Sequence, residues 1–135
     1  MRPEELAEII RHRLNQAQMA LDDAKFLLDG QRSTQSIVNR AYYAMFYAVL
    51  ALLQRIGRVP SRHAGVISLF DTEFVLKGVF PRELSRDFHR AFELRQVSDY
   101  KITADVSQER AVEVWQKAVH FVGVVRNYLV ETLSC

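Results

Sequence analysis

The feature that most constrains this chain is an unbroken run of apolar and aromatic residues from Ala41 to Leu53. A helix that spans a membrane needs about 20 such residues, whereas this run is shorter and lies between Arg40 and Arg55. A segment of this length is typical of a helix buried in a protein core. The sequence therefore predicts that other helices or a second copy of the chain cover this segment, and it predicts no membrane association.

Composition sets the limits within which the run must be buried. A chain of 135 residues is expected to form one domain, spanning residues 1–135, with a single core. The net charge of +2 comes from dispersed basic residues, which argues against a general affinity for polyanions. The only cysteine, Cys135, has no partner for an internal disulfide, and the acidic N-terminal stretch is unlike a signal peptide. We therefore expect a cytoplasmic protein.

Glycine, proline and capping residues divide the chain into five helices, and no alternating strand pattern is found. The first helix is expected to stop at Asp29 and Gly30, and serines or a threonine are expected to cap three others. The expected helices run from Pro3 to about Leu28, from a cap at Ser33 or Thr34 to near Gly57, from a cap at Ser61 to Gly78, from Pro81 to about Val97, and from a cap at Ser107 onward.

Apolar residues recur at intervals of three and four, which gives the long helices an inward face. These faces consist of Ile10, Leu14, Ala17, Leu21, Ala24 and Leu28 in the first helix, of Leu84, Phe88, Ala91 and Phe92 in the fourth, and of Ala111, Trp115, Ala118, Val122, Val125 and Leu129 in the last. Short connections favour neighbouring antiparallel helices. The expected fold is an all-α, up-and-down bundle of four long helices plus one shorter helix.

The second helix is apolar almost all round, so one chain is expected to have difficulty covering it. Contiguous apolar patches commonly mark interfaces. We therefore expect a homodimer in which Tyr42, Phe46, Tyr47 and Leu50 contribute to the interface, the alternative being a self-contained core.

Common catalytic and metal-binding motifs are absent from the sequence. There is no glycine-rich phosphate loop, no pair of cysteines at CxxC spacing and no HExxH or GxSxG motif. The four histidines are scattered, and none has a second histidine or a carboxylate at a spacing that recurs in metal sites. We expect neither a metal nor a cofactor.

Arg95 continues the inward face of the fourth helix, because Leu84, Phe88, Ala91 and Arg95 follow at intervals of four, three and four. A buried guanidinium is always charged and needs a carboxylate, a carbonyl, water or an anionic ligand beside it. One interpretation is an arginine at a helix C-terminus that pairs with a nearby carboxylate such as Asp99. The other is a ligand-binding arginine.

Three segments resemble the HEPN domain family (higher eukaryotes and prokaryotes nucleotide-binding). They are NRAYYAMFYAVLALL, then SRHAGVISLF with the following EFV and GVFPREL, and then AFELRQVSDY. Their order and separation resemble the small prokaryotic branch of the family, over residues 36 to 129. The resemblance implies a bundle of four or five helices that dimerises. It also implies pairing, in many members, with a small nucleotidyltransferase in a toxin and antitoxin system.

In the ribonuclease members of that family, an arginine on the fourth helix is followed four to six residues later by a histidine. Arg95 resembles this arginine, but Tyr100, Lys101 and Ile102 occupy the later positions. A tyrosine, with a reference pKa of about 10, is a poor proton shuttle near neutrality and is better suited to hydrogen bonding or to stacking on a base. The same spacing recurs from Arg58 to His63, in a loop where the family has no catalytic pair.

We expect a ligand cleft where the fourth helix ends. Asp99 and Tyr100 are expected to follow Arg95 on a turn, and Arg40 and Tyr43 to approach from the second helix. A closed Arg95–Asp99 pair would indicate a structural role, whereas an open pocket would indicate a phosphate-containing ligand.

Two functions follow from these residues and from the resemblance. The first is a dimeric module that binds a nucleotide or a partner protein, as the HEPN half of a nucleotidyltransferase pair. The alternative is a metal-independent endoribonuclease toxin in which Arg95 acts with a histidine from elsewhere, His63 or His89, and in which Tyr100 is a weaker candidate. The missing histidine favours the first.

Overall fold

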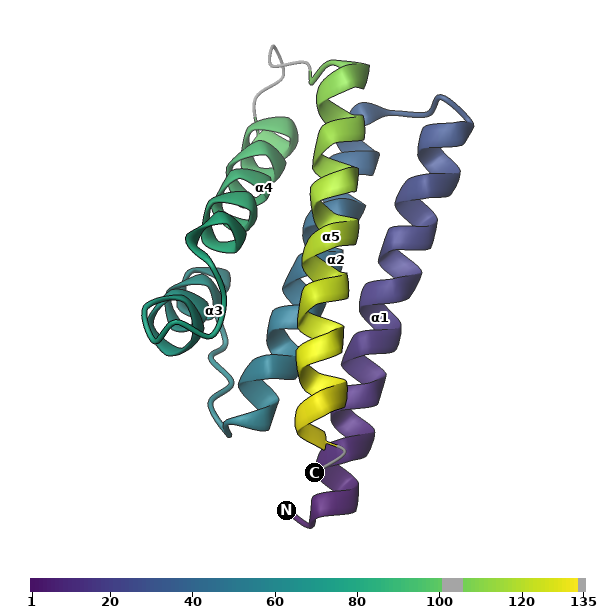
Figure 1. Ribbon diagram of the computed structural model, residues 1–135. Helices are drawn as coiled ribbons and strands as arrows, with labels where there is room; N and C mark the ends of the chain where they lie inside the picture. Colours follow the sequence, from purple (N-terminus) through teal and green to yellow (C-terminus); the bar gives the residue numbers. More distant parts are fainter. Residues whose placement is uncertain (101–105, 134–135) are drawn as a thin grey trace.

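The computed structural model describes residues 1–100 and 106–133, except for the side chains of Tyr100 and Leu133. Its elements are α1 (Pro3–Asp29), α2 (Thr34–Arg55), α3 (His63–Phe70), the π-helical turn η1 (Asp71–Val75), α4 (Arg82–Tyr100) and α5 (Gln108–Leu133) (Figure 1). Within the described residues there is no strand, and four long helices accompany one short helix. The all-α bundle expected from the sequence is confirmed. Lys101, Ile102 and Cys135 lie outside the described residues.

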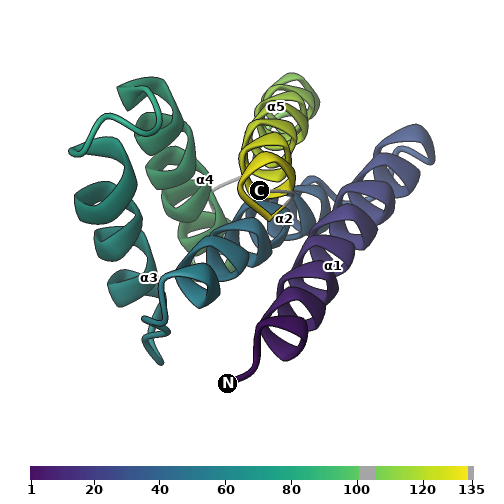
Figure 2. The same ribbon diagram turned by 60° about the horizontal axis from the view of Figure 1, so that its bottom comes forward.

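The bundle is arranged around α2. Helix α1 runs beside α2, α5 lies along both, and α3 and α4 occupy the flank opposite α1 (Figures 1 and 2). In the described part of the chain, α2 is the helix that contacts each of the other four α-helices. This central position explains why the sequence of α2 is apolar almost all round.

Helix α1 begins and ends where its punctuating residues predict. Pro3 lies in the first turn, where its missing N–H leaves no hydrogen bond unmade. The N–H of Gly30 donates to the carbonyl of Phe26 at 3.0 Å and closes the last turn. The expected inward face is buried except for Leu28, which is half-buried at the end of the helix.

Helix α2 is capped by Ser33, whose Oγ accepts a hydrogen bond from the N–H of Ser36 at 3.3 Å, as the sequence predicts. By length and composition the complete helix is long and apolar enough to cross a membrane. In the bundle, however, 67% of its most apolar window is buried. Helix α2 therefore has the burial expected of the core helix of a globular bundle.

The short third helix differs from expectation at its start. Ser61 does not cap it, because α3 begins at His63 and its N-cap is Arg62, which makes no side-chain capping bond. After Phe70 the helix continues as the π-helical turn η1, in which the N–H of Leu76 donates to the carbonyl of Asp71 at 2.8 Å. Gly78, with a φ of 79°, then reverses the chain toward α4.

Helix α4 extends to Tyr100, so the expectation that it ends near Val97 is wrong. Neither glycine nor proline interrupts this stretch, and an ion pair between Arg95 and Asp99 spans its last turn. Asp99 therefore lies on the helix and not on a following turn. Helix α5 is capped as expected, since the Ser107 Oγ accepts a hydrogen bond from the N–H of Arg110 at 3.1 Å.

Candidate functional site

A cluster of aromatic rings connects α2, α3 and α4 on one side of the bundle. Tyr42 lies at its centre and is completely buried, with its ring stacked on those of Phe88 and His63 at centroid distances of 5.9 and 5.8 Å. The imidazole of His63 also stacks on the Phe46 ring at 4.3 Å. The first residue of α3 is thus fixed against the core helix.

The hydroxyl of Tyr42 lies 2.7 Å from Nδ1 of His63. Burial raises the pKa of Tyr42 far above its usual value, an effect that the charge of Arg95 partly opposes and that Tyr43 reinforces, so the hydroxyl keeps its proton. Within the described residues this hydroxyl has no second hydrogen-bond partner, so the arrangement that leaves no buried donor unpaired is the one in which the hydroxyl donates to Nδ1. In the neutral imidazole, Nε2 then carries the ring proton and can donate to a ligand.

His63 is neutral over most of the physiological pH range. Burial lowers the pKa of its imidazole, and the positive charge of Arg95 lowers this pKa further. His63 and Arg95 both contact the ring of Tyr42, so the tertiary structure brings two of the catalytic candidates to one cluster. His89, the other candidate histidine, instead lies 2.6 Å from Oδ2 of Asp71 in η1.

Arg95 packs on aromatic rings and also forms an ion pair. Its Cζ atom lies 5.5 Å from the centroid of the Tyr42 ring and 5.3 Å from that of Tyr43. Its Nε donates to Oδ2 of Asp99 at 3.1 Å, and the side chains of Arg95 and Asp99 are 17% and 21% exposed. Gln35 of α2 donates from Nε2 to the other oxygen of Asp99 at 3.3 Å. The carboxylate therefore joins the end of α4 to the start of α2.

Arg40 approaches the same tyrosine from its own helix. Its Cζ atom lies 5.3 Å from the centroid of the Tyr43 ring, and Nε and Nη2 donate to Oδ1 of Asn39 at 3.1 and 3.0 Å. Two guanidinium groups, from α2 and α4, therefore contact one half-buried phenol ring. We call Arg40, Tyr43, Arg95 and Asp99 the arginine–tyrosine site.

A cavity of about 460 Å³ opens beside this site, between α1, α2 and α4. It is lined by Leu27, Gln35, Ser36, Asn39, Arg40 and Asp99. The Arg95–Asp99 pair of the structural interpretation is therefore present, and Arg95 is not among the described residues that line the cavity. Arg40 and Asp99 are the charged groups that a ligand in the cavity would meet. Tyr100, the fifth candidate for ligand binding, has a side chain outside the described residues.

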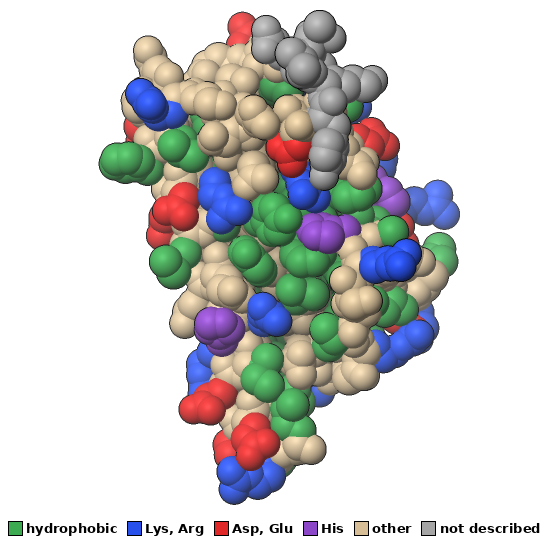
Figure 3. Space-filling model, turned by 180° about the vertical axis from the view of Figure 1, so that it is seen from behind, with side chains coloured by type: hydrophobic (Ala, Val, Ile, Leu, Met, Phe, Trp, Pro, Cys, Tyr) green, Lys and Arg blue, Asp and Glu red, His purple; other side chains and the backbone are tan. Residues whose placement is uncertain are grey.

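The outward face of α2 carries the remaining aromatic residues of the cluster. Tyr43, Phe46 and Tyr47 are half-buried, and hydrophobic side chains gather near the middle of the face that Figure 3 shows from behind. Tyr42 and Leu50 are 0% and 8% exposed, because the chain's own helices enclose them. The expectation that a single chain leaves these two residues uncovered for an interface is therefore wrong.

Several contacts of the site had no signal in the sequence. The pairing of Tyr42 with His63 joins two helices across a loop, and no spacing rule predicts its geometry. Gln35 lies 64 positions before its partner Asp99. The ring of Phe92, one turn before Arg95, lies 5.7 Å from that of Tyr42 and could have been anticipated from the apolar stripe of α4. Among the described residues no group of His, Cys, Asp or Glu is arranged to hold a metal ion.

Comparison with known proteins identifies the family. A family model described as the HEPN domain matches residues 10–128. The UPF0332 protein of Thermotoga maritima is 39% identical over 96% of this chain and 97% of its own length. Two proteins of Methanocaldococcus jannaschii are each named "putative toxin". The first is 34% identical over 69% of this chain and 63% of its own length. The second is 31% identical over 96% of this chain and 95% of its own length. The chain therefore belongs to the HEPN domain family, as the resemblance implied.

Proposed function

We propose that this protein is a dimeric HEPN-domain module that binds a nucleotide, or a nucleotide unit of RNA, at the arginine–tyrosine site. The observation that carries the proposal is the placement of Arg40 and Arg95 at 5.3 Å from the same Tyr43 ring. A planar guanidinium can hold a phosphate through two hydrogen bonds, and a tyrosine ring can stack on a base. Arg40 lines a cavity of about 460 Å³, which is within the size range of small-ligand sites.

The charges of the site assign different parts of a nucleotide to different residues. Arg40 lines the cavity and its only described ion or hydrogen-bond partner is the neutral Asn39, so it is the group available to a phosphate. Asp99 also lines the cavity, and a carboxylate there repels phosphate but accepts hydrogen bonds from ribose hydroxyls. Arg95, held by Asp99, keeps that carboxylate in place.

The proposal includes assembly and cellular context. A second copy of the chain is the proposed occupant of the outward face of α2, where Tyr43, Phe46 and Tyr47 are half-buried. This face continues into the arginine–tyrosine site through Tyr43, so dimerisation would enclose one side of the ligand. Two archaeal relatives are named "putative toxin", which supports a toxin role for this chain. We further propose, from the sequence resemblance, that a small nucleotidyltransferase is its partner in a toxin and antitoxin pair in the cytoplasm.

Calorimetric titration with adenosine monophosphate tests the binding site. We expect dissociation constants in the micromolar to millimolar range and about tenfold weaker binding by the Arg40→Gln variant, which loses a charge-assisted hydrogen bond. Arg55→Gln is the matched control, because Arg55 is an exposed arginine at the other end of the same helix. Absence of binding at millimolar concentration, or equal weakening by both variants, would refute the proposal.

A second function, metal-independent RNA cleavage, is favoured by one observation. His63 and Arg95 both contact the ring of Tyr42, so a histidine and an arginine share one cluster as RNA cleavage requires. The hydrogen bond from Tyr42 leaves the proton on Nε2, which makes that atom a donor and not a base. For this reason we propose ligand binding as the main function and RNA cleavage as the alternative. An assay on transfer RNA in the presence of a chelator, with Arg95→Ala and His63→Ala as controls, separates the two functions.

A further inference from the structure

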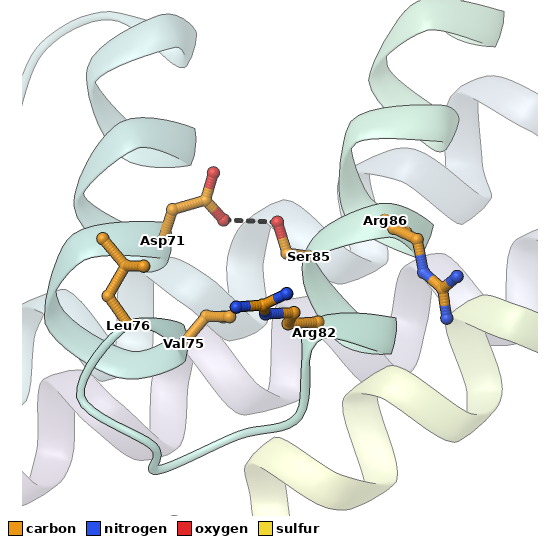
Figure 4. A pocket seen from close by; sticks show the side chains of 6 residues that line it. All are labelled: Asp71, Val75, Leu76, Arg82, Ser85 and Arg86. Carbon is orange, nitrogen blue, oxygen red and sulfur yellow. Dashed lines mark hydrogen bonds between the residues drawn. The ribbon is translucent and has the colours of Figure 1, made fainter.

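A second cavity lies away from the arginine–tyrosine site, between η1 and the first turns of α4 (Figure 4). Its volume is about 720 Å³, and the residues that line it are Asp71, Val75, Leu76, Arg82, Ser85 and Arg86. None of them belongs to the arginine–tyrosine site or to its cavity. Two different elements supply the walls, so the cavity is a feature of the tertiary structure and not of a single helix end.

The acidic residue of this cavity is already engaged by its own chain. Ser85 donates from Oγ to Oδ1 of Asp71 at 2.7 Å, and Nε2 of His89 lies 2.6 Å from Oδ2. Both side chains come from α4, so Asp71 ties the π-helical turn to that helix. The carboxylate therefore serves as a fixed part of the wall, with each of its oxygens occupied.

The basic residues of the cavity are not engaged in this way. Arg82 and Arg86 are exposed, and neither has an ion pair with any residue that the structure describes. In Figure 4 the guanidinium of Arg82 lies over the cavity between Val75 and Ser85, whereas that of Arg86 points toward α5. A guanidinium offers five N–H donors and no acceptor. Arg82 therefore has free N–H donors in the cavity, and an anion is the ligand that would accept hydrogen bonds from them.

The opposite wall is aliphatic. Val75 is half-buried, and Leu76 is 75% exposed although it is a large apolar residue. Val79, which follows in the same loop, is 41% exposed. An aliphatic surface next to an unpaired guanidinium matches a ligand in which a carboxylate adjoins an aliphatic side chain.

We infer that this cavity docks an acidic segment of a partner protein, with a carboxylate bound by Arg82 and an aliphatic side chain packed on Val75 and Leu76. RNA fits the cavity less well, because none of the described residues that line it is aromatic and able to stack on a base. This inference gives the partner protein proposed above a binding site on this chain and an acidic, aliphatic contact segment. It does not depend on nucleotide binding at the arginine–tyrosine site.

Nuclear magnetic resonance titration of the full chain tests the inference. The probe is a short peptide, blocked at both ends, that alternates pairs of glutamate and leucine residues; the comparison probes are the same peptide with glutamine for glutamate, and adenosine monophosphate. We expect the acidic peptide to shift the backbone amide signals of Val75, Leu76 and Ser85. The Arg82→Gln variant should bind it about tenfold more weakly. Arg11→Gln, which changes an exposed arginine on α1, should bind as the unchanged protein does.

Three results would overturn the inference. The first is that millimolar acidic peptide shifts no amide signals at this cavity. The second is that the acidic and the glutamine peptides bind with equal affinity. The third is that adenosine monophosphate shifts the signals at this cavity more than the acidic peptide does. The last result would reassign the cavity to nucleotides. Because Arg82 and Arg40 lie in separate cavities, failure here leaves the nucleotide titration of the Arg40 variant as an independent result.

Discussion

Replacing Tyr42 with phenylalanine isolates the contact that fixes α3 to the core. The substitution keeps the buried ring and its stacking and removes only the hydroxyl that bonds to Nδ1 of His63 at 2.7 Å. A typical side-chain hydrogen bond contributes about 0.5–1.5 kcal/mol. His63 is half-buried, so water can reach part of its ring and the cost of an unpaired nitrogen stays small. We expect the free energy of unfolding to fall by about 1 kcal/mol.

For a domain of this size that change corresponds to a decrease in Tm of roughly 3–5 °C. Urea denaturation followed by circular dichroism measures it. Tyr128→Phe is the control, because Tyr128 is a half-buried tyrosine whose hydroxyl makes no hydrogen bond within the described part of the structure. A double-mutant cycle with His63→Phe, which retains an aromatic ring, should give a coupling energy of about 1 kcal/mol. A coupling energy near zero would refute the assignment of this hydrogen bond.

Three further predictions follow from the structure. Burial lowers the pKa of His63 in the folded state, so the unfolded chain binds more protons just below the usual histidine pKa. Denaturant unfolding at a series of pH values should therefore show the free energy of unfolding falling as the pH drops through about 6.5. The fall should be smaller in the His63→Phe variant. Burial raises the pKa of Asp87, whose Oδ2 has no hydrogen-bond partner within the described residues, so Asp87→Asn should raise the Tm at neutral pH and lose this advantage in acid. Phe46→Glu should weaken the proposed dimer, or the fold, by a few kcal/mol, and sedimentation showing the unchanged protein as a monomer at tens of micromolar would contradict the dimer.

The case of α4 shows how far the sequence alone could describe the site. The periodicity of Leu84, Phe88 and Ala91 indicated that Arg95 faces inward, and the structure places Arg95 against the rings of Tyr42 and Tyr43. The predicted end of α4 is wrong, because an i,i+4 ion pair holds its last turn and no glycine or proline ends the helix earlier. A tertiary partner, Gln35, holds the same carboxylate.

The number, order and approximate bounds of the helices follow from the amino-acid sequence alone. They do so because helix formation and capping depend on residues three or four positions apart, as with Ser33 and Ser107. The sequence also identified the family through the order of its aromatic and arginine-containing segments.

Which side chains from different helices meet depends on the tertiary structure. It buried Tyr42 and Leu50 inside one chain, brought His63 to the same tyrosine as Arg95, and placed Asp71 of η1 against Ser85 of α4. These contacts depend on how the helices cross and how their rings interlock. Spacing along one helix carries no information about the rotation and offset of its neighbour, so the sites of this protein are set by packing.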